Sequence, residues 1–188
     1  KIRASKERIL RSCEVGHWLG SEDRVRIVFH CGFYGGAGGD RELAFQNIKS
    51  AILEMMEEIK KKKWNVELCP ELMGKKNVFG SIGEISQLVD ETGCGFCIDF
   101  AHVLARYGKH EFDLLEKKFL QKKWHCHFSG IEYGEKGEKK HKKTEIEEWK
   151  VVLSGIPKSK EVVIINESPD PVGDAVLGVK VFGGKLGG

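Results

Sequence analysis

The sequence lacks an apolar run long enough to span a bilayer, and its first residues, Lys1 to Lys6, are polar. A secretory signal peptide would place a hydrophobic segment near this point, so none is visible and we expect a cytoplasmic protein. Neither sign of charge dominates, because 31 Lys and Arg residues stand against 28 Asp and Glu residues, for a net charge of +3. That balance is compatible with a nucleic-acid partner but does not demand one.

Two common ligand-binding motifs are also missing. The glycine-rich segment 31–40 has neither G-x-G-x-x-G nor P-loop spacing, so it is read as a flexible loop that cradles no phosphate. The six cysteines lie singly in apolar stretches, as is typical of buried thiols in a reducing compartment. Cys94 and Cys97 have C-x-x-C spacing, but strand alternation sends them to opposite faces, which disfavours a redox or zinc-ribbon role.

What the sequence does contain is a regular alternation of short apolar strands and helical patterns. This alternation predicts an α/β fold with a parallel sheet and right-handed crossovers. A length of 188 residues suffices for one sizeable core, so we expect a single domain over 1–188, with a disordered tail at 182–188. The predicted strands cover 24–30, 65–71, 95–100, 123–129 and 161–167. The predicted helices cover 5–19, 42–63, 80–91, 103–107, 112–120, 144–153 and 172–181, and 130–143 is read as a polar loop.

Each predicted strand ends in a side chain that can bind a metal ion. These residues are His30, Glu71, Asp99, His127 and Glu167. Because parallel strands bring their carboxyl ends to one rim, we expect the five side chains to converge there. Carboxylates that close together cannot all stay ionised without a cation. Histidine and carboxylate ligands without a thiolate suit catalytic zinc or manganese.

Each of these residues, and the neighbouring His125, also has an ordinary alternative reading. A strand-end acid such as Glu71, taken alone, is more often a helix cap or an ion-pair partner. His125, which shares a strand face with His127, is equally well read as a core histidine packed below the site. The joint pattern of five ligands at five strand ends is what indicates a metal site.

Six short segments carry a resemblance to a known family. They are Val28-Phe29-His30, Cys69-Pro70-Glu71-Leu72-Met73-Gly74, Cys97-Ile98-Asp99-Phe100-Ala101-His102, His127-Phe128-Ser129-Gly130-Ile131-Glu132-Tyr133, Gly137-Glu138-Lys139-Lys140-His141 and Asn166-Glu167-Ser168-Pro169. The chain resembles endonuclease IV, the metal-dependent apurinic/apyrimidinic endonuclease of the xylose isomerase-like TIM-barrel superfamily, and is most similar to archaeal-type members. The resemblance implies a TIM (β/α)8-type barrel of which about five βα units, strands four to eight, are present. We therefore expect the three amino-terminal strands to be absent.

The resemblance also implies up to three zinc ions, with manganese as an alternative at one or more positions. His30 and Glu71 would bind the first ion. Glu71 would bridge to a second ion, whose other ligands would be Asp99, His127 and Glu167. Glu71 and Glu167 are accordingly the implied catalytic residues.

His102 and His141 would hold the third ion of the family. Its carboxylate ligand lies just before the histidine that corresponds to His141. Lys139 occupies the aligned position in this sequence, and Glu138 is the nearest acid. The resemblance therefore points to Glu138 as the carboxylate of the third ion, displaced by one residue from the family pattern.

The activity implied by the resemblance is cleavage of DNA 5′ to an abasic site in base excision repair. The partner would be abasic double-stranded DNA, with no membrane, and the full-length protein would be a monomer. Lysines of the rim loops would contact phosphates, although an ordinary solvated charge is the alternative for most of them: Lys75, Lys76, Lys136, Lys139, Lys140, Lys142 and Lys143. Two other readings are a sugar isomerase or epimerase on the same barrel and an inactive fragment. The pair His102 and His141 has no obvious use in an isomerase.

Overall fold

The computed structural model describes residues 2–20 and 24–186. The chain divides into two compact units. The amino-terminal unit consists of Lys1–Glu71 and Val78–Phe96, and the carboxy-terminal unit of Leu72–Asn77 and Cys97–Gly188. Parallel strands joined through helices form the sheet of each unit, which confirms the α/β class. The expectation of a single domain stays a prediction.

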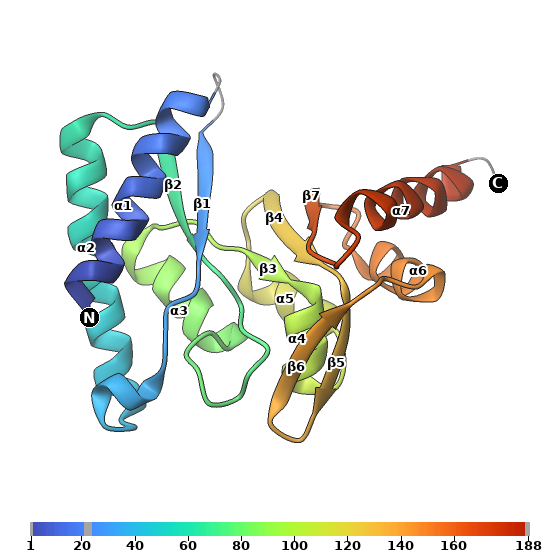
Figure 1. The fold of residues 1–188 in the computed structure, drawn as a ribbon, viewed down its shortest axis with the longest axis horizontal. Coiled ribbons are helices and arrows are strands. Elements are labelled where there is room, and N and C mark those ends of the chain that lie inside the picture. The colour runs from blue at the N-terminus through green and yellow to red at the C-terminus, as the bar shows by residue number, and fades with distance from the viewer. Residues whose placement is uncertain (1, 21–23, 187–188) are drawn as a thin grey trace. The chain divides into compact units, whose positions relative to one another are not determined.

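The amino-terminal unit is built on two parallel strands, β1 (Val25–Phe29) and β2 (Val66–Pro70). Helix α1 (Ile2–Leu19) packs on both strands, and α2 (Arg41–Lys62) packs on α1 and on β2 (Figure 1). Helix α3 (Ile82–Thr92) packs on α2. These elements match the prediction within a few residues.

The glycine-rich segment after β1 is more ordered than its composition suggested. It contains a short 3-10 helix, η1 (Tyr34–Ala37), and the buried Tyr34 donates a hydrogen bond of 2.6 Å to the Glu84 carboxylate. Burial by itself would raise the pKa of Glu84, but hydrogen bonds from Tyr34 and Ser81 outweigh burial and lower it. Glu84 also completes the capping box of α3 with Ser81, so one ionised side chain anchors both the loop and the helix.

The carboxy-terminal unit holds a parallel sheet of three strands in the order β3-β4-β7. The strands are β3 (Ile98–Asp99), β4 (Lys123–Phe128) and β7 (Glu161–Asn166). An antiparallel hairpin of β5 (Gly130–Gly134) and β6 (Gly137–Lys142) follows β4 (Figure 1). The helices are α4 (Phe100–Tyr107), α5 (Phe112–Lys118), α6 (Ile146–Gly155) and α7 (Pro171–Leu186).

Strand β4 separates the apolar core from the candidate metal residues. Trp124, Cys126 and Phe128 alternate along one face and are at most 2% exposed. Phe128 packs edge-on against Trp149 of α6, with ring centroids 4.9 Å apart. His125 and His127 occupy the other face because side chains alternate along a strand. The apolar half of this strand therefore fixes which way the histidines point.

Two parts of the sequence-based prediction are wrong. Residues 130–143 form a hairpin that packs on α4 instead of a polar loop, and its charged strands with few β-branched residues gave no local strand signal. The tail that was expected to be disordered from 182 is helical as far as Leu186. Each glycine there weakens the helix by only about 1 kcal/mol, and no proline interrupts it. Residues 187–188 of that tail lie outside the described part of the chain.

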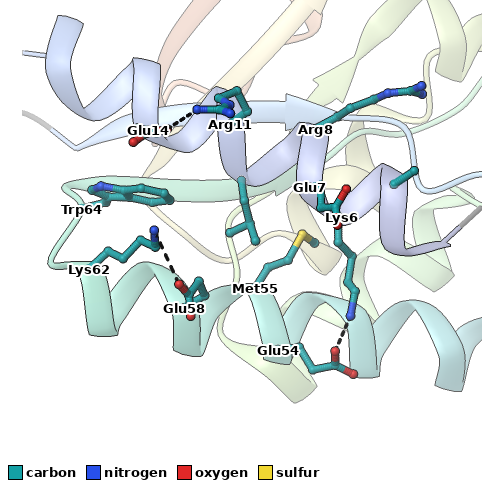
Figure 2. A pocket seen from close by; sticks show the side chains of 12 residues that line it. Lys6, Glu7, Arg8, Arg11, Glu14, Glu54, Met55, Glu58, Lys62 and Trp64 are labelled. Carbon is teal, nitrogen blue, oxygen red and sulfur yellow. Dashed lines mark hydrogen bonds and ion pairs between the residues drawn. The ribbon is translucent and has the colours of Figure 1, made fainter.

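A groove between α1 and α2 is lined by charges of both signs (Figure 2). Lys6 of α1 forms an ion pair with Glu54 of α2, and Lys62 lies 3.7 Å from Glu58. The groove contains none of the predicted metal ligands. Among the described helices, none has the length and hydropathy that crossing a membrane requires.

Candidate metal centre

In the amino-terminal unit, the register of the two strands brings His30 and Glu71 together. Phe29 of β1 is the partner of Pro70 of β2, so the residue that follows each strand lies at the same level. His30 Nε2 is 3.0 Å from the Glu71 carboxylate. The structure thus supports the predicted pairing of these two side chains.

In the carboxy-terminal unit, a first cluster gathers three predicted ligands. Asp99 and His127 are register partners in β3 and β4, and Glu167 follows β7 with its amide donating to the carbonyl of Phe128. The possible ligand atoms of Asp99, His127 and Glu167 all lie within 4.8 Å of one another. His127 Nδ1 is 3.1 Å from the Glu167 carboxylate. We call this set the Glu167 cluster.

A second cluster combines Asp99 with His102 and His141, whose ligand atoms also lie within 4.8 Å of one another. Asp99 is the N-cap of α4, and its Oδ1 accepts a hydrogen bond of 2.8 Å from the His102 amide. This cap places the His102 side chain in the first turn of α4, beside the carboxylate. Asp99 belongs to both clusters, whereas the sequence assigned it to one ion only. We call this second set the His102 cluster.

Hydrogen bonds orient the ring of His102. Its Nδ1 lies 2.9 Å from the carbonyl oxygen of Leu72, which can only accept a hydrogen bond, so Nδ1 carries the proton. Its Nε2 lies 3.5 Å from the Glu138 carboxylate. An imidazole that carries its proton on Nδ1 directs the lone pair of Nε2 towards that carboxylate, an arrangement suited to a cation between the two groups. A histidine that donates to a carbonyl through one nitrogen and binds a cation through the other is a common metal-site arrangement.

Ser129 orients His141 in a similar way. The Ser129 hydroxyl donates its single hydrogen to the carbonyl oxygen of Gly130 at 3.0 Å. The Ser129 oxygen is 2.6 Å from Nδ1 of His141, so a hydrogen bond between these two atoms holds the imidazole ring in place. The rings of His102 and His141 stand nearly perpendicular, with centroids 5.3 Å apart. Sequence reasoning had given Ser129 no role.

A β-bulge explains how Glu138 reaches the His102 cluster. Ile131 pairs with His141 and Tyr133 pairs with Glu138. Two residues of β5, Glu132 and Tyr133, therefore face three residues of β6, 138–140. Lys139 is the extra residue. In a regular strand, residues three apart point to opposite faces, but the bulge returns Glu138 and His141 to the same face. The bulge therefore places Glu138 on the same face of the hairpin as His141, and its role as a ligand of the third ion stays a prediction.

This geometry predicts that the hairpin tolerates loss of its extra residue. Deleting Lys139 would leave a Glu-Lys-His sequence in regular register, with both possible ligands still on one face. We expect metal content and thermal stability close to those of the parent chain. Deleting both Lys139 and Lys140 should instead make Glu138 and His141 adjacent, which places them on opposite faces of a strand and should lower the metal content, measured by atomic absorption. Full metal content in the double deletion would contradict this role of the bulge.

Three of the seven rim lysines that were predicted to contact DNA have acidic neighbours. Lys140 lies 3.1 Å from Glu132, Lys142 3.0 Å from Glu148, and Lys143 2.9 Å from Asp170. The hydrogen bond to Asp170 raises the pKa of Lys143. Three other lysines lie close together through backbone contacts. The amide of Lys76 donates to the carbonyl oxygen of Lys136, and Lys75 forms an isolated β-bridge with Gly137. Lys139 is the exposed residue of the bulge.

One further group was missed by the sequence reasoning. Possible ligand atoms of Cys97, His125 and His127 lie within 4.8 Å of one another. Strand alternation already places Cys97 on the face of Asp99 and His125 on the face of His127. Only the register between β3 and β4 brings the two pairs together. All six cysteines are free thiols, as expected. Burial, and after it the charge of Asp99, raises the pKa of Cys126, which lies on the opposite face of β4.

Comparison with known protein families identifies the family of this chain. The family model described as xylose isomerase-like TIM barrel matches residues 1–173. The chain belongs to this family. Its parallel strands and helices fit a part of such a barrel, and no closed barrel is formed by the described residues. Family members are enzymes, and the family is typically metal-dependent, which agrees with the ligand clusters.

Individual relatives in the family have different names. The uncharacterized protein MJ0133 of Methanocaldococcus jannaschii is 34% identical over 154 residues, which are 75% of this chain and 54% of that protein. The chain therefore spans about half the length of this curated relative.

Two solved structures share the fold. The crystal structure of SacUVDE has a TM-score of 0.73 at 19% identity, over 98% of this chain and 60% of that one. A D-tagatose 3-epimerase-like protein has a TM-score of 0.66 at 17% identity, over 98% of this chain and 69% of that one.

Proposed function

We propose that the chain carries a divalent-metal site that hydrolyses the DNA phosphodiester 5′ to an abasic residue, as endonuclease IV does. The observation that carries this proposal is the pair of ligand clusters that share Asp99. Hydrolysis of a phosphodiester profits from two neighbouring ions, since one can activate the attacking water and the other can stabilise the leaving oxygen. A single carboxylate common to both clusters is suited to hold two ions close together.

The donor set fits zinc or manganese. The Glu167 cluster offers two carboxylates and an imidazole, and the His102 cluster with Glu138 offers two imidazoles and two carboxylates. Bound ions would lower the pKa of water and neutralise phosphate charge. Asp99 is fully buried, so it holds its position whether or not substrate is present. The Glu167 side chain is 40% exposed and can meet a substrate while it stays within 3.1 Å of His127.

The first ion of the family remains part of the proposal. His30 and Glu71 lie together in the amino-terminal unit and supply an imidazole and a carboxylate. We assign Glu71 the catalytic role that the resemblance implies. Replacing Glu71 should therefore lower incision as much as replacing Glu167.

Lysines near the hairpin turn are the proposed DNA contacts. The backbone pairing of Lys76 with Lys136 places positive charges at one end of the hairpin, beside Lys75. Each phosphate that such a lysine neutralises releases counterions, so binding should weaken steeply as salt rises. We expect Lys136→Ala to lower the salt dependence of duplex binding, measured by fluorescence anisotropy across a salt series.

A sugar epimerase is the second candidate function. It is favoured by the epimerase-like neighbour above and by 3-keto-D-glucoside 4-epimerase YcjR from E. coli, with a TM-score of 0.62 at 10% identity, over 95% of this chain and 70% of that one. The Glu167 cluster alone would serve such a reaction at a single ion. His102, His141 and Glu138 distinguish the two functions, because a one-ion epimerase leaves them without a task.

The test of the proposal is incision of a duplex that contains a tetrahydrofuran abasic analogue. With zinc or manganese we expect one cut 5′ to the analogue, leaving a 3′-hydroxyl, and a chelator should abolish it. Glu167→Gln should reduce incision more than about 100-fold, since loss of a mere outer partner of a metal ligand costs 10–100-fold. Glu161→Gln is the matched control, because Glu161 begins the same strand and pairs with the exposed Lys122. An uncut duplex, together with turnover of a ketose, would establish the epimerase instead.

A further inference from the structure

A second ligand group lies one step below the Glu167 cluster on the same sheet face. Asp99 and His127 are register partners. Cys97 and His125 each precede them by two residues, so alternation places all four side chains on one face of the sheet. Along β3 and β4 the possible ligands therefore change, from a carboxylate and an imidazole at the rim to a thiol and an imidazole beneath it.

The lower group consists of Cys97, His125 and His127, and it contains a soft donor, the sulfur of Cys97. The sulfur of Cys97 and one nitrogen each of His125 and His127 lie within 4.8 Å of one another. Cys97 is fully buried and His127 is 7% exposed. The imidazoles of His125 and His127 meet at an interplanar angle of 71° with centroids 5.4 Å apart, so the rings do not stack and their nitrogens can converge on one point.

We propose that Cys97, His125 and His127 form a separate binding site for a thiolate-seeking cation of the zinc or copper(I) class. A thiolate with two imidazoles suits these ions and is unsuited to magnesium or calcium. Binding would replace the thiol proton by the cation, which forms a sulfur–metal bond and releases one proton to solvent. Imidazole has two nitrogens, so His127 can face this site with one and Glu167 with the other.

The sheet face leaves the site accessible from outside. Val163 of β7 is the register partner of His125 and is 52% exposed, and Ile165 beside His127 is 46% exposed. His125 is itself only partly buried. A cation can therefore reach the site from the side of His125, and the site does not depend on the phosphodiesterase proposal.

Cobalt(II) titration of the full chain tests the site, because a thiolate ligand gives an intense near-ultraviolet charge-transfer band that carboxylate and imidazole ligands do not. We expect the band in the parent chain and its loss in Cys97→Ser. Cys126→Ser is the matched control, since Cys126 neighbours His127 on β4 but points to the opposite face, and it should keep the band. His125→Asn should weaken cobalt binding at least tenfold while its helical circular dichroism stays unchanged.

The outcomes separate this site from the proposed nuclease. A band that survives Cys97→Ser, or one that is absent from the parent chain, would overturn the thiolate site. If Cys97→Ser loses its circular dichroism, the partly buried His125→Asn decides the question, and unchanged cobalt affinity in that variant would refute the site. A Cys97-dependent band in a chain that cuts no abasic duplex would refute only the nuclease.

Discussion

Asp99→Asn is expected to abolish incision of abasic duplex, by more than about 100-fold, and to empty both ligand clusters of metal. Asp99 is the one carboxylate shared by the Glu167 and His102 clusters, and an amide oxygen is neutral and a poor ligand for zinc. The fold should survive the change. Asparagine caps helices as well as aspartate does, so the hydrogen bond to the His102 amide is kept. Atomic absorption, incision and thermal melting measure the three effects.

Asp40→Asn is the control for the structural part of that change. Asp40 caps α2 through a hydrogen bond of 3.0 Å to the Leu43 amide, which is the role that Asp99 has at α4. It belongs to neither cluster. We expect unchanged metal content and unchanged incision in this variant. Full metal content in Asp99→Asn would remove Asp99 from the site and with it the two-ion proposal.

Gly137→Ala is expected to have the second large effect, by disrupting the hairpin that carries Glu138 and His141. Gly137 has a φ of +92°, which is unfavourable for a residue with a side chain. A methyl group there would lie 2.1 Å from the backbone oxygen of Gly74, which cannot move aside as a flexible side chain would. Backbone strain of this kind costs about 1–3 kcal/mol, and the clash adds to it. Chemical denaturation should show the loss of stability, and metal analysis a loss of the ion at His102.

Gly83→Ala supplies a control of opposite sign. Gly83 lies in α3, and nothing comes within 4 Å of an added methyl group. Alanine should stabilise the helix by about 0.5–1 kcal/mol. Unchanged stability and metal content in Gly137→Ala would mean that the close approach to Gly74 does not hold the hairpin in place.

The sequence by itself determined the strand ends and hence most of the candidate ligands. Strands rich in β-branched and aromatic residues have a strong local signal, and in parallel strands the carboxyl ends share a rim. Short-range chemistry therefore predicted Asp99, His127 and Glu167 as candidate ligands.

The tertiary structure decided which of these side chains meet and through which atoms. The hairpin over Gly130–Lys142 has no local strand preference and forms through pairing and packing on α4. Its bulge at Lys139 places Glu138 on the face of His141, the contact with Ser129 orients the His141 ring, and the register of β3 with β4 places Cys97 beside His125. These are contacts between residues distant in sequence. Their geometry depends on strand register and on the packing of the core, neither of which is encoded in any short segment.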